Sequence, residues 1–225
     1  RDLRLSRGLW DVYKRQVEDG NLELLKLLAT TSSEIAQGEV LQLQHNKEID
    51  ILEETYLNII SSKTASLFAA ATKVGAIIAE KDLKYKNALE FYGKNLGLTF
   101  QIADDTLDYN SELKLFGKNI GNDFYEGKVT LPIILLYQKV DKFEKEKLKS
   151  FFEKDIREKQ DLEHVLVLIK KNNIINECYK KAEHYINLAS NSLSVFEESE
   201  EKNILKNLTS CLLYTSPSPR DSRRS

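Results

Sequence analysis

The 225-residue chain is poor in cysteine, glycine and proline, and each shortage narrows its fold class. Its two cysteines, Cys178 and Cys211, are too few for a disulfide framework and lack the spacing of a zinc site, which fits a protein of the reducing cytoplasm. Nine glycines and three prolines supply few of the breaks that turn-rich β structure needs. With 41% hydrophobic and 30% charged residues, the composition favours an all-α fold around one core.

The sequence also lacks an apolar run long enough to cross a membrane. Its most apolar segment, ASLFAAATKVGAIIA, contains Lys73 and is shorter than the roughly 18 to 20 residues that a span requires. We therefore expect a buried core helix there and no transmembrane segment.

Neither sign of charge dominates the whole chain, but the two ends differ from the middle. The formal net charge is −2, with +3 on residues 1–16 and +2 on residues 211–225, which leaves about −7 between them. An acidic body argues against nucleic-acid binding. Both ends lack a helical or strand period and resemble foreign or disordered segments, with natural tails as the alternative, so we place the folded domain at residues 17–210.

Apolar residues recur at helical spacing through this domain and predict an antiparallel helix bundle. We expect Gly117 and Gly121 to break a looser piece, and Pro132 to kink a helix that Asn122 caps. The charged run at residues 139–159 is expected to be a solvated helix face with i, i+4 ion pairs. The expected helices are residues 22–43, 54–79, 86–108, 122–140, 142–152, 161–171, 174–196 and 200–208.

Three aspartates within five positions interrupt an apolar helix in the segment LTFQIADDTLDY. At about 100° per residue, Asp104 and Asp108 lie about 40° apart, with Asp105 beside them and Gln101 on the same side. Such carboxylates repel one another unless a cation lies between them, and an all-oxygen cluster without His or Cys suits Mg²⁺ better than zinc. A solvated acidic helix end is the alternative interpretation.

The approach to these aspartates is expected to be open, because Gly93 and Gly97 lie on the same face one and two turns earlier. An adjoining apolar stripe is expected to face the core, and it consists of Leu89, Leu96, Phe100, Ala103 and Leu107.

Lysines occupy positions where apolar residues are expected. Lys63 lies within the apolar stripe of its helix, with the hydroxyl of Thr64 next to it, and Lys128 follows Phe124 at i+4 on an inward face. Lys118 lies between Gly117 and Gly121 in the loop. Buried lysines almost always have a partner. Inward lysines beside an inward acid cluster predict a bound anion, and a diphosphate bridged by Mg²⁺ satisfies both signs of charge.

The segments FQIADDTLD and GKNIGNDFYEGKVTLP resemble the second aspartate-rich region and downstream lysines of the all-trans polyprenyl diphosphate synthases. IAQGEVLQL and YLNIISSKTASLFAAATKVGA are similar to the two preceding helices of that family. The resemblance runs from about residue 21 to residue 208 and is strongest to bacterial long-chain members, such as octaprenyl and decaprenyl synthases. It implies the helix bundle of the isoprenoid synthases.

The resemblance also implies roles for individual residues. Asp104, Asp105 and Asp108 are expected to bind Mg²⁺ together with an allylic diphosphate. In such enzymes the allylic C–O bond ionises, isopentenyl diphosphate attacks the carbocation, and proton loss leaves a longer allylic chain. The resemblance also implies that the product supplies a quinone side chain. A homodimer is implied as well. The residues expected to contact the substrate are Lys63, Thr64, Gln101, Lys118 and Lys128. The three lysines among them are expected to be catalytic. Glu39 and Gln42 belong to the resemblance without an assigned role.

The chain departs from the family pattern before IAQGE, where members carry a DDxxD or DDxxxD motif and basic residues for isopentenyl diphosphate. Neither is present, so we expect the C-terminal part of such an enzyme, lacking its N-terminal helices. Two other interpretations stay open. A non-catalytic helical subunit of a heteromeric synthase would not need DDTLD and the lysines, and a class I terpene cyclase is disfavoured by GKVTLP.

Overall fold

The structure is a computed structural model that describes residues 21–110 and 120–214, and these residues form helices without any strand. A π-helical turn, Ser61–Ala65, joins two of the helices, and a 3-10 turn, Leu193–Val195, follows a third. The expected all-α class is confirmed. The helices are α2 (Leu22–Gln44), α3 (Glu53–Ile60), α4 (Ser66–Ile78), α5 (Leu83–Leu107), α6 (Asn122–Glu126), α7 (Leu131–Lys139), α8 (Lys142–Glu153), α9 (Lys159–Lys171), α10 (Ile174–Ser192) and α11 (Glu200–Tyr214).

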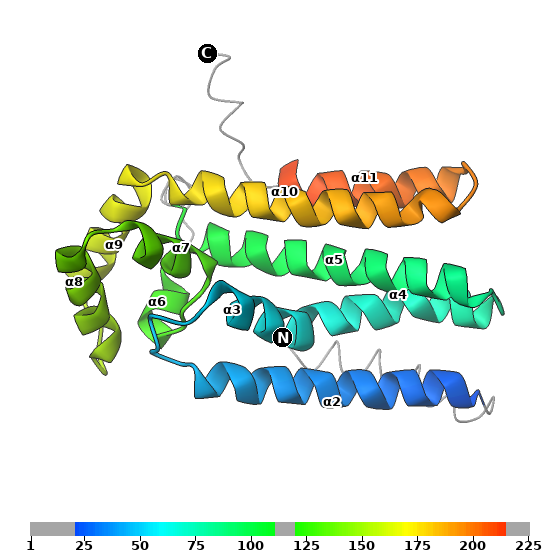
Figure 1. Ribbon diagram of the computed structural model, residues 1–225, viewed down its shortest axis with the longest axis horizontal. Helices are drawn as coiled ribbons and strands as arrows, with labels where there is room; N and C mark the ends of the chain where they lie inside the picture. Colours follow the sequence, from blue (N-terminus) through cyan, green and yellow to red (C-terminus); the bar gives the residue numbers. More distant parts are fainter. Residues whose placement is uncertain (1–20, 111–119, 215–225) are drawn as a thin grey trace, which may run out of the picture.

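Helix α5 is the centre of the bundle (Figure 1). It packs against α4 on one side and α10 on the other, while α2 packs on α4 and the π-helical turn, and α11 packs on α10. Neighbouring long helices run in opposite directions, as expected for an antiparallel bundle. The short helices α6 to α9 gather at the end of the bundle where α5 ends.

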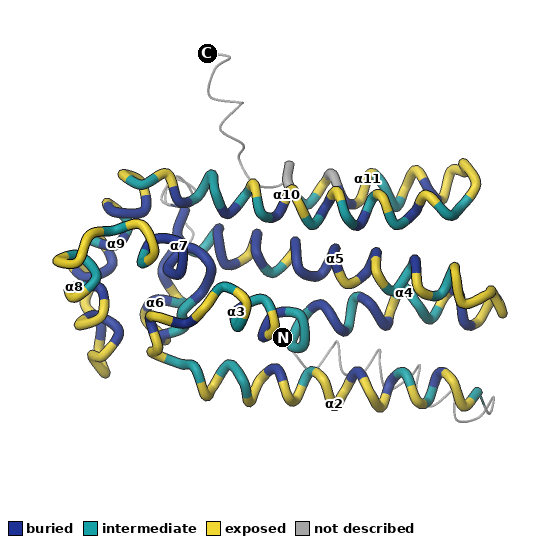
Figure 2. Tube along the Cα trace, in the orientation of Figure 1, coloured by how far each residue is buried: buried dark blue, intermediate teal, exposed yellow. Residues whose placement is uncertain are grey.

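Burial explains the central place of α5. Its second half is buried nearly all round, whereas α2 is exposed over most of its length (Figure 2). Phe100 is an exception: it lies 43% exposed on α5, so its expected place in the core is wrong, and its ring instead contacts Phe68 at 5.6 Å between centroids. The largest fully buried side chains around the end of α5 are Ile102, Tyr109, Phe124, Leu131, Ile133, Leu136, Leu148 and Phe152.

The face of α5 that carries Gly93 and Gly97 is covered rather than open. A Cβ at Gly93 would lie 2.3 Å from the carbonyl oxygen of Phe68, and one at Gly97 would lie 2.6 Å from the Cα of Ala65. These glycines therefore let α4 and the π-helical turn approach the backbone of α5, and the expected open approach at this face is wrong.

The helix expected over residues 54–79 is interrupted by the π-helical turn, which contains Lys63. Such single turns are frequent at functional sites because they displace side chains from the regular helical phase. The turn also packs against α2, where a Cβ on Gly38 would lie 2.5 Å from the backbone nitrogen of Lys63. Gly38 thus allows α2 and the turn to meet backbone to backbone.

Residues 122–140 form two helices instead of the single kinked helix that we expected. Gly127 ends α6 in the left-handed conformation, with φ of 75°, which is accessible to glycine without a steric cost. Pro132 lies in the first turn of α7, where its missing N–H is not needed, so it starts a helix rather than kinking one. Asn122 is the first residue of α6, and Gly121 occupies the cap position.

The charged run at residues 139–159 is only partly a solvated face. Its side chains form ion pairs with other elements, such as Lys154 with Asp161 at 2.7 Å and Lys47 with Asp155 at 2.9 Å, as well as an i, i+4 pair of the expected kind, Lys159 with Glu163 at 3.8 Å on α9. Phe152 and Arg157 within it are buried. The amphipathic period of α8 explains the phenylalanine, because its apolar face packs on the core.

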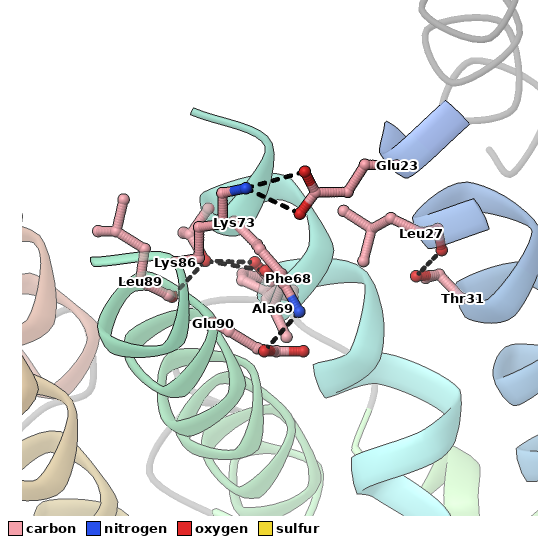
Figure 3. A network of polar contacts seen from close by, with 10 residues as sticks. Glu23, Leu27, Thr31, Phe68, Ala69, Lys73, Lys86, Leu89 and Glu90 are labelled. Atoms are coloured by element: carbon pink, nitrogen blue, oxygen red, sulfur yellow. Dashed lines mark hydrogen bonds and ion pairs between the residues drawn. The ribbon is translucent and has the colours of Figure 1, made fainter. Parts of the chain in front are cut away.

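A groove of about 730 Å³ lies between α2, α4 and α5. Two ion pairs connect its walls: Lys73 to Glu90 at 2.7 Å between α4 and α5, and Lys86 to Glu23 at 2.8 Å between α5 and α2 (Figure 3). Both acidic and basic side chains line it, and none of the predicted site residues does. The Lys86–Glu23 pair links α2 to α5 at this groove.

In the described part of the chain, no helix combines the length and the apolar character of a membrane span.

Candidate functional site

A second cavity, of about 130 Å³, brings together many of the residues that the sequence singles out. One wall comes from α3 and the π-helical turn, a second from the last turns of α5, and a third from α6 and the segment before α7. The predicted site residues that line it are Lys63, Gln101, Asp104, Asp105 and Lys128. The other residues that line it are Gln42, His45, Asn46, Ile51, Tyr56, Ile59, Ile60, Asp123, Val129 and Thr130.

Asp105 is the most deeply buried carboxylate of this cavity, at 4% exposure. Tyr56 donates its hydroxyl hydrogen to Oδ2 at 2.7 Å, and the Gln101 amide donates to Oδ1 at 2.7 Å. Thr64 in turn donates its hydroxyl hydrogen to the side-chain Oε1 of Gln101 at 2.8 Å. Each oxygen of Asp105 is thus held by one neutral donor, which fixes its orientation without neutralising its charge.

The carboxylates of the cavity are destabilised as anions. Burial raises the pKa of Asp105 to about 7, and the nearby charge of Asp123 adds to this effect, while the hydrogen bonds from Tyr56 and Gln101 oppose it. Burial likewise raises the pKa of Asp123 to about 6, with a further contribution from Asp108 and an opposing one from Lys128. A cation between Asp105 and Asp123 would relieve this repulsion.

Lys63 faces the cavity from the π-helical turn, with a side chain that is 31% exposed. Its ammonium lies 2.9 Å from Glu39 and 2.7 Å from the Gln42 oxygen, both on α2. The two residues for which the sequence offered no role are therefore its partners. One acidic partner at a half-exposed position leaves the ammonium able to contact an anion in the cavity.

Lys128 faces the cavity from the turn between α6 and α7, not from the helix face that we expected. Its ammonium contacts Glu126 at 2.5 Å and Asp123 at 3.7 Å. Burial alone would lower the pKa of Lys128, but the hydrogen bond to Glu126 and the charge of Asp123 outweigh burial and raise it. The side chain is therefore a cation across the physiological pH range.

Asp108 does not line the cavity. Its carboxylate accepts the backbone N–H groups of Asn122 at 3.1 Å and Asp123 at 2.9 Å, and so caps the N-terminus of α6. Burial raises the pKa of Asp108, and these hydrogen bonds oppose that change. Asp104, by contrast, is exposed and lines the cavity, so the expectation that all three aspartates point the same way is wrong.

Of the other predicted site residues, Thr64 reaches the cavity only through its hydrogen bond to Gln101. Lys118 and Gly117 lie outside the described residues.

The donor set of the cavity fits a hard divalent cation. Over residues 21–110 and 120–214, no three His, Cys, Asp or Glu side chains converge closely enough to hold a metal alone. The cavity nevertheless presents the oxygen atoms of Asp104, Asp105 and Asp123, and Asp105 has no cationic hydrogen-bond partner. Mg²⁺ commonly takes one or two protein carboxylates and completes its coordination with water and substrate phosphates.

Sequence reasoning missed Asp123 and Tyr56. Asp123 lies five residues before Lys128 in GNDFYEGK, and a carboxylate so close to a predicted anion-binding lysine is a signal that could have identified it. Tyr56 belongs to the apolar stripe of its helix, and nothing in that pattern distinguishes it from a core tyrosine whose hydroxyl has no role in a site.

Comparisons with known proteins identify relatives of this chain. The sequence profile of the Polyprenyl synthetase family matches residues 5–169. An all-trans-nonaprenyl-diphosphate synthase (geranyl-diphosphate specific) from Rhodobacter capsulatus is 37% identical over 193 residues, which cover 86% of this chain and 58% of that protein.

Solved structures give the same result. A decaprenyl diphosphate synthase from Rhodobacter capsulatus has a TM-score of 0.86 and 34% identity, covering 92% of this chain and 63% of that one. A polyprenyl synthase from Caulobacter crescentus, complexed with calcium and isoprenyl diphosphate, has a TM-score of 0.83 and 35% identity, covering 89% of this chain and 61% of that one. The chain thus spans about 60% of the length of these relatives, and it belongs to the polyprenyl synthetase family.

Proposed function

We propose that the cavity binds the diphosphate group of an allylic substrate together with Mg²⁺, as part of a prenyltransferase that extends an all-trans polyprenyl diphosphate with isopentenyl diphosphate. The observation that carries this proposal is the convergence of Lys63 and Lys128 with Asp104, Asp105 and Asp123 around one cavity. Two cations and three carboxylates in so small a space suit a ligand that carries both negative oxygens and a divalent metal.

The lysines would act on the leaving group. When the allylic C–O bond breaks, negative charge grows on the departing diphosphate, and ammonium groups that already face it stabilise that charge. A divalent cation bound by one or two of the cavity carboxylates, with water and the diphosphate completing its coordination, would further neutralise the same oxygens. The new C–C bond to isopentenyl diphosphate and the loss of a proton then complete the extension.

The apolar part of the cavity wall has a separate task. Ile51, Ile59 and Ile60 line the cavity beside the charged groups. Such walls limit access of water, which would otherwise capture the carbocation.

Further parts of the proposal rest on the family alone. They are a homodimeric assembly, a cytoplasmic location, a long product and its use in a quinone side chain.

Incubation of the protein with radiolabelled isopentenyl diphosphate, a geranyl or farnesyl diphosphate primer and Mg²⁺ tests the proposal. Extended, acid-labile product that forms with the wild type and is strongly reduced with Lys128→Ala would support the proposal. Cyclic hydrocarbon products instead would support a terpene cyclase. Extension that appears only after a complete synthase is added, and that is insensitive to Lys128→Ala, would support a non-catalytic subunit.

A further inference from the structure

Arg157, which lies between α8 and α9, is a buried cation at only 6% exposure. Its guanidinium lies over the rings of Phe152, at 5.3 Å, and Phe124, at 6.0 Å. Its hydrogen-bond partners are carbonyl oxygens instead of carboxylates, since one Nη donates to Phe152 at 2.7 Å and the other to Tyr125 at 3.2 Å. A buried charge needs partners that compensate it, and for Arg157 these are backbone carbonyl groups.

The two carbonyl groups lie at the C-termini of two different helices. Phe152 is in the last turn of α8, and Tyr125 is in the last turn of α6. The last carbonyl groups of a helix have no partner within it and carry the negative end of the helix dipole. Arg157 therefore joins two helix ends with one planar group and is compensated by both.

The guanidinium also lies directly against the residue that ends α6. A Cβ on Gly127 would be 2.8 Å from an Nη atom of Arg157, so a larger residue there would displace the guanidinium. The next backbone N–H, that of Lys128, donates to the Asp123 carbonyl oxygen at 2.9 Å. Arg157 thus abuts the turn that directs Lys128 and Asp123 into the cavity.

We propose that Arg157 is a positioning residue for the diphosphate site. It never reaches the cavity, but it holds the C-terminal end of α6, while Asp108 holds the N-terminal end. Helix α6 has only five residues and cannot hold its own shape, so these two clamps fix the placement of Lys128. The inference rests on the proposed diphosphate binding only for its effect on ligand affinity.

Arg157→Lys is the informative variant, because a lysine keeps the charge but cannot bridge two carbonyl groups and stack on two rings. Lys154→Ala is the matched control, since it removes a cation of the same loop whose partner is Asp161 on α9. We expect the Lys128 amide to exchange with solvent on the order of tenfold faster in Arg157→Lys than in Lys154→Ala, without ligand. Equal exchange in the two variants would overturn the inference.

A double-mutant cycle separates positioning from general stability. By titration calorimetry with inorganic diphosphate and Mg²⁺, we expect Arg157→Lys to weaken binding by on the order of tenfold in the wild type and by less than about twofold in the Lys128→Ala background. Equal losses in both backgrounds would show that Arg157 does not act through Lys128. If the wild-type protein binds no diphosphate, the proposed function fails, while the amide exchange still decides whether Arg157 holds the turn.

Discussion

Replacing Asp105 with asparagine should make the ligand-free protein more stable while removing a charge that its function needs. With a pKa of about 7 in the folded protein and 3.8 as the reference, ionised Asp105 costs up to about 4 kcal/mol at pH 8. Asparagine keeps the shape but not the charge, and it loses about 1 kcal/mol of hydrogen bonding with Tyr56 or Gln101. We expect Asp105→Asn to be about 2 to 3 kcal/mol more stable than the wild type at pH 8.

The pH dependence gives a sharper form of the same prediction. Because the pKa of Asp105 is higher in the folded protein, the native state binds more protons between pH 3.8 and about 7, and stability falls as pH rises through that window. Between pH 5.5 and 8, the contribution of Asp105 amounts to about 2 kcal/mol. The variant lacks this contribution and retains those of Asp123 and Asp108, whose pKa values burial also raises.

Urea unfolding followed by circular dichroism, in EDTA at pH 5.5 and pH 8, measures both quantities. Asp155→Asn is the control, because Asp155 is exposed and its pKa is lowered by Lys47, so it stays ionised at both pH values. Parallel pH profiles for the wild type and Asp105→Asn would refute the reasoning, as would a less stable variant at pH 8.

Three further predictions concern packing, affinity and proton release. Gly38→Ala should destabilise the protein by about 1 to 3 kcal/mol, because the added Cβ meets the π-helical turn. Gly75→Ala, whose Cβ meets nothing within 4 Å, should stabilise it by up to about 1 kcal/mol, and thermal unfolding distinguishes the two variants. Lys128→Ala should weaken the binding of inorganic diphosphate with Mg²⁺ by about 10- to 100-fold in calorimetry. Lys139→Ala, which breaks a surface pair with Glu177, should leave the affinity unchanged. Equal effects of the two variants would mean that no specific anion site includes Lys128. At pH 6.5, metal and diphosphate binding should release about 0.8 proton more from the wild type than from Asp105→Asn, as measured in buffers of different ionisation enthalpy. An equal release would show that Asp105 does not ionise on binding.

The parts of this structure that the sequence predicts are those governed by local periodicity. The long helices, and the placement of Lys63 and the Asp104–Asp105 pair around one space, follow from the helical spacing of apolar and charged residues. Lys63 lies on the π-helical turn before α4, and the two aspartates lie on α5. The apolar faces of these elements must meet, so the convergence of the three residues could be anticipated.

Contacts between distant segments explain what could not be predicted. The break after α6 depends on Gly127 adopting a left-handed conformation against Arg157, thirty residues later, and no local pattern reports such a contact. Asp108 caps α6 because the chain folds back after α5 and brings the backbone N–H of Asp123 to the Asp108 carboxylate. The π-helical turn adds a residue to one turn of a helix, which changes the phase on which a stripe argument depends.

The central claim is that Lys63, Lys128 and the carboxylates of the cavity bind a diphosphate together with Mg²⁺. Titration calorimetry of inorganic diphosphate with and without Mg²⁺, on the wild type and on Asp104→Asn, tests it most directly. The account predicts binding that requires Mg²⁺ and that weakens strongly in Asp104→Asn. Binding that is absent from the wild type, or equal with and without the metal, would contradict it.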